Sequence, residues 1–200
     1  MFESRESDQV DARKLARYAR VDPEILHPVR LRDSDQQRDL VLIRARAALI
    51  RARTPLINAV RGLVKPFGYR LSACDADCFA ACCRQELPRA VQTSLSSLVE
   101  QIAQLTRQIQ DYDLRIRTVA ENKYPDTAPL RNVFGVGPVT ALTFVLTLAD
   151  PQRFASSRDG GCYLGLQPQR HQSGEHDPQL GITKTGNCYL RWLLVECAHQ

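Results

Sequence analysis

The chain has 200 residues, of which 44% are hydrophobic and 24% charged, a composition typical of a globular protein with one ordinary domain or two small ones. No apolar run approaches the roughly 18 residues that a membrane span requires, and residues 1–8 have neither the basic start nor the apolar stretch of a signal peptide. We therefore expect a cytoplasmic protein with no membrane partner.

The basic residues are unusual in type and in position. The formal net charge is +5, and 23 of the 27 basic residues are arginine, the better bidentate partner for phosphate, although a GC-rich genome produces the same bias. Residues 38–70 carry eight basic residues and one acidic residue, Asp39. This block predicts either a stripe that faces phosphate, with Arg44 and Arg51 as candidate nucleic-acid contacts, or a solvated helix face.

The cysteines do not form a recognisable metal or disulfide pattern. There are seven of them, an odd number, and the Cys-x-x-Cys pairs usual in zinc sites are absent. Cys74, Cys78 and Cys82 are spaced to share one helical face. We interpret the cysteines as small buried residues.

The first half of the chain predicts two helices joined by a linker. Residues 8–19 have the pattern of a short helix, with Ser7 as a suitable N-cap. Prolines at 23 and 28 predict an extended linker over residues 21–33. A long helical pattern returns over residues 34–65, where Pro55 is expected to kink or split the helix.

The clearest periodicity lies in residues 88–121, where apolar side chains recur at alternating steps of four and three. These positions are Val91, Leu95, Leu98, Ile102, Leu105, Ile109, Tyr112, Ile116 and Val119. Such a narrow seam needs a partner helix. The partner is either the 34–65 helix, folding back as an antiparallel coiled-coil hairpin, or the same seam in a second copy, which predicts a homo-oligomer.

The remaining residues predict a small helical region. Residues 130–150 indicate a helix, a Gly135-Val136-Gly137 turn and a second helix from Pro138. A polar loop follows over residues 167–187, and a last amphipathic helix begins near Asn187 and continues to residue 200. The predicted fold is mainly α, divided into residues 1–33, 34–122 and 123–200.

Three groups of residues are candidates for chemistry. Asp8 and Asp11 project from one face of a helix start, which suits either a hard cation such as Mg²⁺ or simple helix capping. The turn at Gly135 and Gly137 resembles a helix-hairpin-helix, whose free N–H groups bind a backbone phosphate, or is an ordinary turn between helices.

The polar loop holds the third group. Ser173 precedes a glycine and is a candidate nucleophile, with His171 and His176 as possible bases, or it belongs to a simple turn. Later in the loop, Lys184 and Arg191 are candidates to contact phosphate, and Asn187 to cap the last helix or contact DNA.

In order along the chain, these segments resemble the DEDD-type insertion-sequence transposases of the IS-one-ten family. In that family a RuvC-like half precedes a coiled coil and a serine-bearing transposase half with a helix-hairpin-helix-like turn. The opening SDQVDARKLARYA at residues 7–19 is similar to the last RuvC-like motif, and residues 38–53 resemble the basic first coil helix. The transposase half is matched by FGVG at 134–137, RF at 153–154, YLGLQP at 163–168, QSG at 172–174, GITKTGN at 181–187 and LR at 190–191.

The resemblance implies roles for several residues. Asp8 and Asp11 are the third and fourth acids of a Mg²⁺ site, and Ser173 is the nucleophile that joins covalently to DNA. A structured guide RNA is an implied partner beside DNA. The chain departs from the family in Glu6, which stands where a basic residue is usual, and in having no counterpart for the first two acids of the site. We therefore expect a truncated or decayed copy, or a fragment of a longer gene product, that is inactive by itself. Residues 1–33 would be a RuvC-like remnant and linker, 34–122 the coiled-coil hairpin, and 123–200 the N-terminal part of the serine-bearing domain.

Three functions compete at this stage: a DNA recombinase by descent, a non-catalytic nucleic-acid-binding module, and a coiled-coil assembly protein. The ordered motifs favour the first over the third. Only activity separates the first from the second.

Overall fold

The computed structural model describes residues 8–23, 32–170 and 178–199, and they are mainly helical, as the sequence predicts. They divide into two compact units, residues 1–33 and 34–200. In the first unit, helix α1 (Asp8–Val21) has Asp8 and Asp11 in its first turn and buries none of its residues. None of the described helices is both long enough and apolar enough to cross a membrane.

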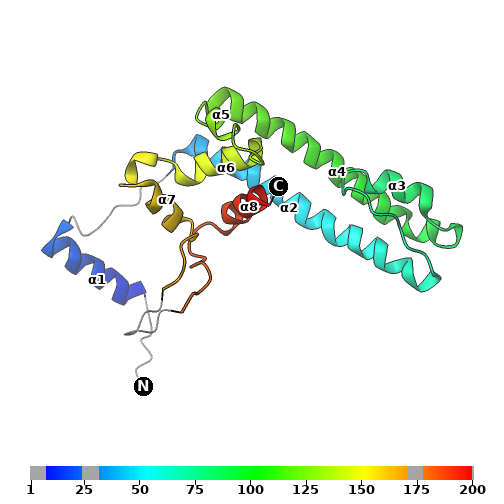
Figure 1. Cartoon of the computed structure of the whole chain (residues 1–200), viewed down its shortest axis with the longest axis horizontal. Helices are drawn as coiled ribbons and strands as arrows, with labels where there is room; N and C mark the ends of the chain where they lie inside the picture. The colour runs from blue at the N-terminus through cyan, green and yellow to red at the C-terminus, as the bar shows by residue number, and fades with distance from the viewer. Residues whose placement is uncertain (1–7, 24–31, 171–177, 200) are drawn as a thin grey trace, which may run out of the picture. The chain divides into compact units, whose positions relative to one another are not determined.

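The second unit is built on an antiparallel pair of long helices, α2 (Ser34–Leu63) and α4 (Arg89–Lys123), which lie side by side in Figure 1. Contacts near the start of α2 reach the end of α4, and contacts farther along α2 reach earlier residues of α4. The 34–65 helix is thus the partner of the 88–121 seam. Pro55 lies inside α2 without splitting it.

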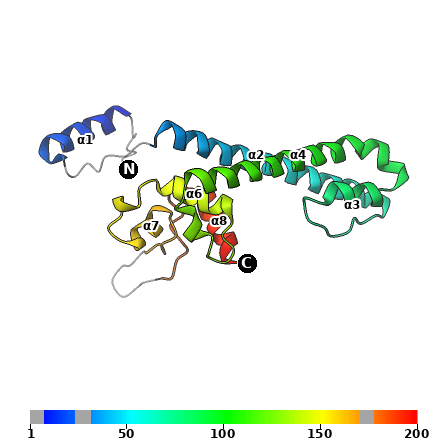
Figure 2. The same cartoon turned by 90° about the horizontal axis from the view of Figure 1, so that it is seen from above.

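The apolar surface of α4 is wider than a strict heptad seam. Six of the expected seam residues are buried, and Leu98, Tyr112 and Val119 are half-buried. Val99, Ala103 and Ala120 are also buried, because an α-helix of 3.6 residues per turn presents a broader stripe to more than one neighbour. Those neighbours are α2 along its length, α3 near one end and α6 near the other (Figure 2).

Charged side chains are buried in the seam between α2 and α4. Asp39, 5% exposed, accepts hydrogen bonds from Tyr124 Oη at 2.9 Å and from Lys123 Nζ at 3.3 Å. Arg46 forms a bidentate ion pair with Asp113, the Nη2–Oδ2 distance being 3.2 Å. Asp39 and Arg46 lie one heptad apart on α2, and their contacts tie this helix to the end of α4 and to an earlier turn of it.

Arg53 forms the third polar contact of the seam. It is 6% exposed, and its Nη1 donates to Thr106 Oγ1 of α4 at 3.1 Å and to Asp77 Oδ1 at 2.6 Å. Asp77 comes from the connection before α3 (Phe79–Glu86), so this arginine joins three segments. Below it, an apolar cluster that includes Val60, Phe79 and Ile102 fills the space between α2, α3 and α4.

At the other end of the hairpin, α6 (Pro138–Leu148) is buried on two sides. Leu142 and Leu146 pack with Ile43 and Ile116 of the long helices. On its other side, Leu148 packs with Leu164, which follows α7 (Ser157–Tyr163), and with Leu190 of α8 (Cys188–Ala198). An almost wholly apolar sequence suits a helix covered in this way.

The segment before α6 corrects one expectation. The helix predicted to begin at Leu130 is instead the short α5 (Thr127–Leu130), and residues 131–135 form turns. Their amides bond three residues back, as in Val133 N to Leu130 O at 3.1 Å and Val136 N to Val133 O at 3.1 Å. Bonds of this kind close single turns and do not propagate an α-helix.

The seam predicts a sharp contrast between two leucines of α4. Leu105 is 6% exposed and Leu114 is 62% exposed. Leu105→Asp places a carboxylate among apolar side chains and should lower the free energy of unfolding by several kcal/mol, about 3–5. Leu114→Asp, on the same helix, should change it by less than about 1 kcal/mol. Urea denaturation of both variants measures this, and equal effects would contradict the seam.

Candidate functional site

The two ends of the polar loop are held together by backbone hydrogen bonds. Gln169 N donates to Gly181 O at 2.8 Å, and Thr183 N donates to Gln167 O at 2.9 Å, around an isolated bridge between Pro168 and Ile182. Lys184 N adds a bond to Gly165 O at 3.1 Å. We call these paired segments, residues 165–169 and 181–186, the loop base. Ser173, His171 and His176 lie outside the described residues.

Two glycines let the two sides of the loop base approach closely. Gly165 and Gly186 both have positive φ, 68° and 75°. A Cβ on Gly165 would lie 2.2 Å from Thr185 O, and one on Gly186 would lie 2.0 Å from Tyr163 O. Backbone atoms cannot move far enough to relieve such contacts. Glycine is therefore required at both positions for two reasons: the positive φ, and the lack of space for a Cβ.

Arg191 fastens the loop base to helix α8. Its Nη1 donates to two backbone carbonyls, Thr185 O of the loop base at 2.7 Å and Leu164 O, directly before the other side of the loop base, at 2.9 Å. Charge-assisted bonds of this kind are about twice as strong as neutral ones. The Arg191 guanidinium therefore stabilises the fold. Its contact with phosphate stays a prediction.

Asn187 and Lys184 lie beside this clamp. The Asn187 side chain accepts from Tyr189 N at 3.0 Å and Leu190 N at 3.1 Å, which makes it the N-cap of α8. Of the two roles expected for Asn187, the structure describes the cap. Lys184 is exposed and has φ of 58°, so its ammonium group stands at the surface of the loop base.

The glycines of the predicted phosphate-binding turn differ in what they do. Gly135 has φ of 80°, and a Cβ there would lie 2.6 Å from Cys197 O, so its place is set by packing against the end of α8. Gly137 is the N-cap of α6 and precedes Pro138 at the first turn, and a Cβ at this glycine would meet no described atom within 4 Å. Phosphate binding at this turn stays a prediction.

The arginines of α2 fall into two heptad-spaced sets. Arg46 and Arg53 point into the seam and are paired with acids. Arg44 and Arg51 are exposed, and within residues 8–23, 32–170 and 178–199 no acidic side chain forms an ion pair with either. Arg44 and Arg51 are the residues that the sequence predicts to contact nucleic acid, and their charges are not neutralised by ion pairs within the described residues.

The predicted Mg²⁺ ligands can be judged by their surroundings. Asp8 and Asp11 are exposed, and Asp11 lies 3.5 Å from Lys14 Nζ, whose positive charge opposes a cation. In the described part of the chain no group of three or more Asp, Glu, His or Cys side chains is placed to hold a metal. The two carboxylates alone do not make up the oxygen set that Mg²⁺ requires.

The cysteines near α3 are not a metal centre either. Cys83 is buried, Cys74 and Cys82 are half-buried and Cys78 is exposed, so the expectation of small buried residues holds for some of them. Burial raises the pKa of the Cys74 and Cys83 thiols, which keeps them protonated and poor as ligands or nucleophiles. Nearby, the Ser72 N–H donates to Glu86 at 2.8 Å and lowers the pKa of that carboxyl.

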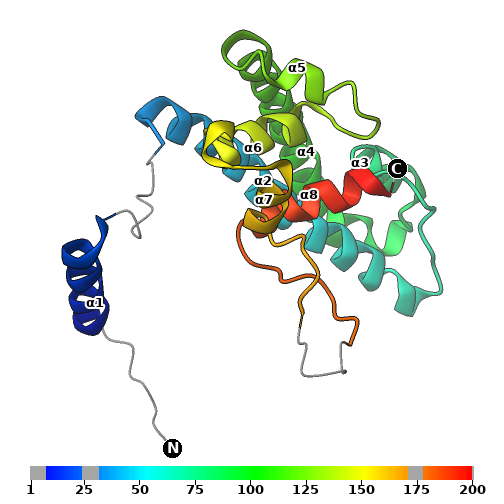
Figure 3. The same ribbon diagram turned by 60° about the vertical axis from the view of Figure 1, so that its left-hand side comes forward.

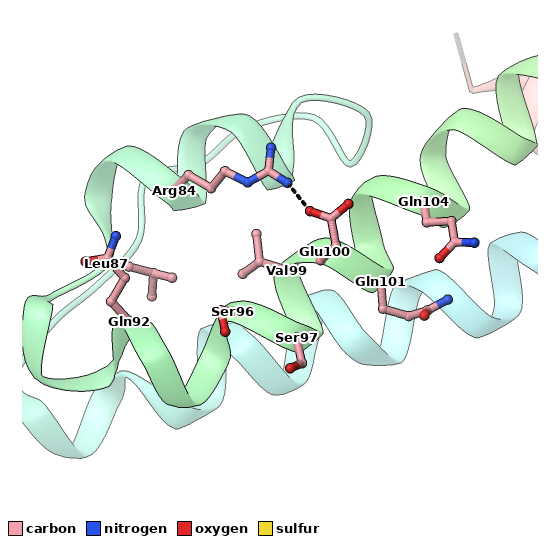
Figure 4. Close-up of a pocket in the computed structure, with 9 residues that line it drawn as sticks. All are labelled: Arg84, Leu87, Gln92, Ser96, Ser97, Val99, Glu100, Gln101 and Gln104. Atoms are coloured by element: carbon pink, nitrogen blue, oxygen red, sulfur yellow. Dashed lines mark hydrogen bonds and ion pairs between the residues drawn. The ribbon is translucent and has the colours of Figure 1, made fainter.

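Among the described residues of the second unit, side chains line a hollow at each of two helix pairs. One, between α3 and α4, is lined mainly by polar side chains and crossed by the ion pair of Arg84 with Glu100 at 2.6 Å (Figure 4). The other lies between α2 and α8 and is mainly apolar, with Trp192 and Tyr189 on its α8 side. Sequence analysis missed the second hollow, although an aromatic pair on a basic protein's last helix was a signal for it.

Comparison with known proteins adds a family to this geometry. Residues 127–200 match the model of the transposase IS116/IS110/IS902 family. Over 175 residues the chain is 30% identical to a transposase for insertion sequence element IS1111A of Coxiella burnetii, an alignment covering 82% of this chain and 46% of that relative. A probable family 20 transposase of Pseudomonas aeruginosa is 31% identical over 187 residues, covering 85% and 52%. The chain spans about half the length of the curated relatives it matches.

The loop base predicts a contrast between two glycines. Gly165→Ala should lower the free energy of unfolding by more than about 1–2 kcal/mol, because alanine resists positive φ and its Cβ meets Thr185. Gly160→Ala is the control, because Gly160 lies within α7 with open space around it. This change should raise the free energy of unfolding by about 0.5–1 kcal/mol. Thermal denaturation gives the stabilities, and hydrogen exchange at the Lys184 amide reports the loop base directly. Unchanged exchange in Gly165→Ala would refute its role there.

Proposed function

Because this chain belongs to the IS116/IS110/IS902 family of transposases, we propose that it binds DNA and carries the serine-bearing part of a DNA strand cleavage and rejoining activity. The observation that carries the proposal is the loop base. Interlocked glycines and the Arg191 clamp hold the ends of the segment that contains Ser173 against α8. A nucleophile needs such a rigid support, since a misplacement of about 1 Å can cost a hundredfold in rate.

The proposed step is transesterification. The Ser173 hydroxyl oxygen attacks a DNA phosphodiester, a Ser–O–P bond forms, one P–O bond to a deoxyribose oxygen breaks, and that oxygen leaves as a hydroxyl. The serine proton passes to a base and then to the leaving oxygen. Attack by a hydroxyl of another strand end on the Ser–O–P ester rejoins DNA and frees the serine. One phosphoester is exchanged for another at each stage, so no oxidant, reductant or nucleotide is consumed.

Asp8 and Asp11 fit a divalent metal site only in part. We propose that they supply two carboxylates toward Mg²⁺, which in such chemistry stabilises charge on phosphate oxygens. Their exposure and the nearby Lys14 make them insufficient alone. In this proposal the chain by itself binds nucleic acid but does not complete the reaction. Structured guide RNA and a second copy of the chain are further proposed partners.

A non-catalytic nucleic-acid-binding module is the alternative function. It is favoured by the same exposed arginines, Arg44 and Arg51, and needs neither Ser173 nor a metal. Both functions require electrostatic binding of nucleic acid, so a binding experiment tests what they share. An assay of covalent chemistry then distinguishes the recombinase from the non-catalytic module.

DNA binding should depend steeply on salt and on the exposed arginines of α2. Each phosphate contact contributes about −0.9 to the slope of log K against log salt concentration. The double variant Arg44→Gln/Arg51→Gln should bind a labelled DNA duplex more weakly and make the slope less negative by roughly 1.8. Fluorescence anisotropy at several salt concentrations measures both quantities.

The matched control is Arg84→Gln/Arg107→Gln, which removes the same charge from arginines that pair with Glu100. It should leave the slope nearly unchanged. Equal losses in the two double variants would mean that net charge, and not the α2 stripe, governs binding.

Covalent chemistry should be absent from the isolated 200-residue chain. Incubated with Mg²⁺ and DNA, it should give no protein–DNA adduct on a denaturing gel, because two exposed carboxylates hold Mg²⁺ weakly. An adduct that disappears in Ser173→Ala would establish the serine as nucleophile and overturn the proposed incompleteness of the metal site.

A further inference from the structure

The hollow between α2 and α8 combines an aromatic wall with a cation. The two helices that border it, α2 and α8, are labelled in Figure 3. On the α2 side the hollow is lined by Ala47, Ile50, Arg51, Thr54 and Pro55, and on the α8 side by Tyr189 and Trp192. Trp192 is 52% exposed, and its ring is stacked on that of Tyr189 with centroids 6.1 Å apart and planes at 27°. A large flat apolar surface is thereby left open to solvent.

The charge around this surface is of one sign. Among the described residues no carboxylate lines the hollow, and the one charged residue there is Arg51. In the described segments Arg51 has no ion pair, and Arg44, one heptad earlier on α2, has none either. A purely hydrocarbon ligand would leave these two guanidinium groups without a partner. A ligand that joins a flat ring to phosphates would stack on the aromatic side chains and form ion pairs with the arginines.

We propose that the hollow binds an unpaired base of single-stranded DNA, which stacks on Trp192 while Arg51 contacts an adjacent phosphate. Stacking of bases on aromatic side chains beside a cationic stripe is how proteins hold single strands without reading their sequence. The inference rests on the proposed DNA binding and adds a site to it. Strand exchange requires bases to leave the duplex, and this hollow gives one of them a place.

The single tryptophan of the chain makes the proposal directly testable. All tryptophan fluorescence comes from Trp192, so a base stacked on it should quench the emission of the wild-type protein. The probes are an oligothymidylate of about a dozen nucleotides, an abasic strand of the same length and a hairpin duplex. We expect quenching with oligothymidylate and little with the other two, although both carry the phosphates that Arg51 binds.

Variants separate stacking from attraction to phosphate. Trp192→Leu should weaken oligothymidylate binding about tenfold, measured by anisotropy of a labelled strand, and leave binding of the abasic strand unchanged. Phe67→Leu is the control, because Phe67 is also an exposed aromatic residue but lies outside the hollow. It should not change either affinity. The wild-type quenching needs no variant and holds if Trp192→Leu fails to fold.

Other outcomes overturn the inference in distinguishable ways. Binding of oligothymidylate without quenching refutes the stacking site and leaves the proposed DNA binding standing. A blue shift of Trp192 emission that grows with protein concentration, without DNA, shows that a second copy of the chain covers the hollow. Absence of binding to all three probes refutes the proposed function and the inference with it.

Discussion

The antiparallel packing of α2 on α4 is the constraint on which the rest of residues 34–200 depends. Helix α6 rests on both long helices through Leu142 and Leu146, and α8 rests on α6. The loop base is in turn tied to α8 by Arg191. Each candidate site of this unit is thus placed relative to the hairpin by a chain of buried contacts, and a shift of α4 along α2 would move all of them.

The register of the hairpin is set by polar groups more than by its apolar residues, because a heptad seam is nearly the same after a slip of one heptad. Arg46 faces Asp113 and Arg53 faces Thr106. A slip of one heptad in one direction would bring Asp39 toward Asp113, two like charges. A slip in the other direction would set Arg46 against Ala120 and bring Arg53 toward Asp113, so that Arg46 would lose its acidic partner. Both slips therefore replace an ion pair of the seam with a less favourable arrangement.

Sequence periodicity predicted the long helices and their pairing, because burial of an apolar stripe repeats at fixed intervals. It could not identify Asp39 or Arg53 as buried, since a charged residue in a basic block has the same pattern whether it is solvated or paired with a residue far along the chain. For the same reason periodicity could not show that Arg191 bonds the carbonyls of Leu164 and Thr185. The N-cap role of Asn187 was among the predictions, because its partners, Tyr189 N and Leu190 N, directly follow it in the sequence. No helix continues past Leu130 as expected, because the amides of Val133 and Val136 bond to carbonyls three residues back and close single turns.

The basic block of α2 divides into arginines that stabilise the fold and arginines that are free for the proposed nucleic-acid binding. Arg46 and Arg53 stand one heptad apart and are used in the seam, while Arg44 and Arg51 have the same spacing and remain exposed. Because the two sets stand on different faces, charge can be removed from the second without breaking a buried ion pair. The salt dependence of binding then separates the two roles, since solvent ions screen exposed charges far more than buried ones. A stretch that composition alone describes as a single basic block is therefore two surfaces, one paired with acids within the fold and one exposed to solvent.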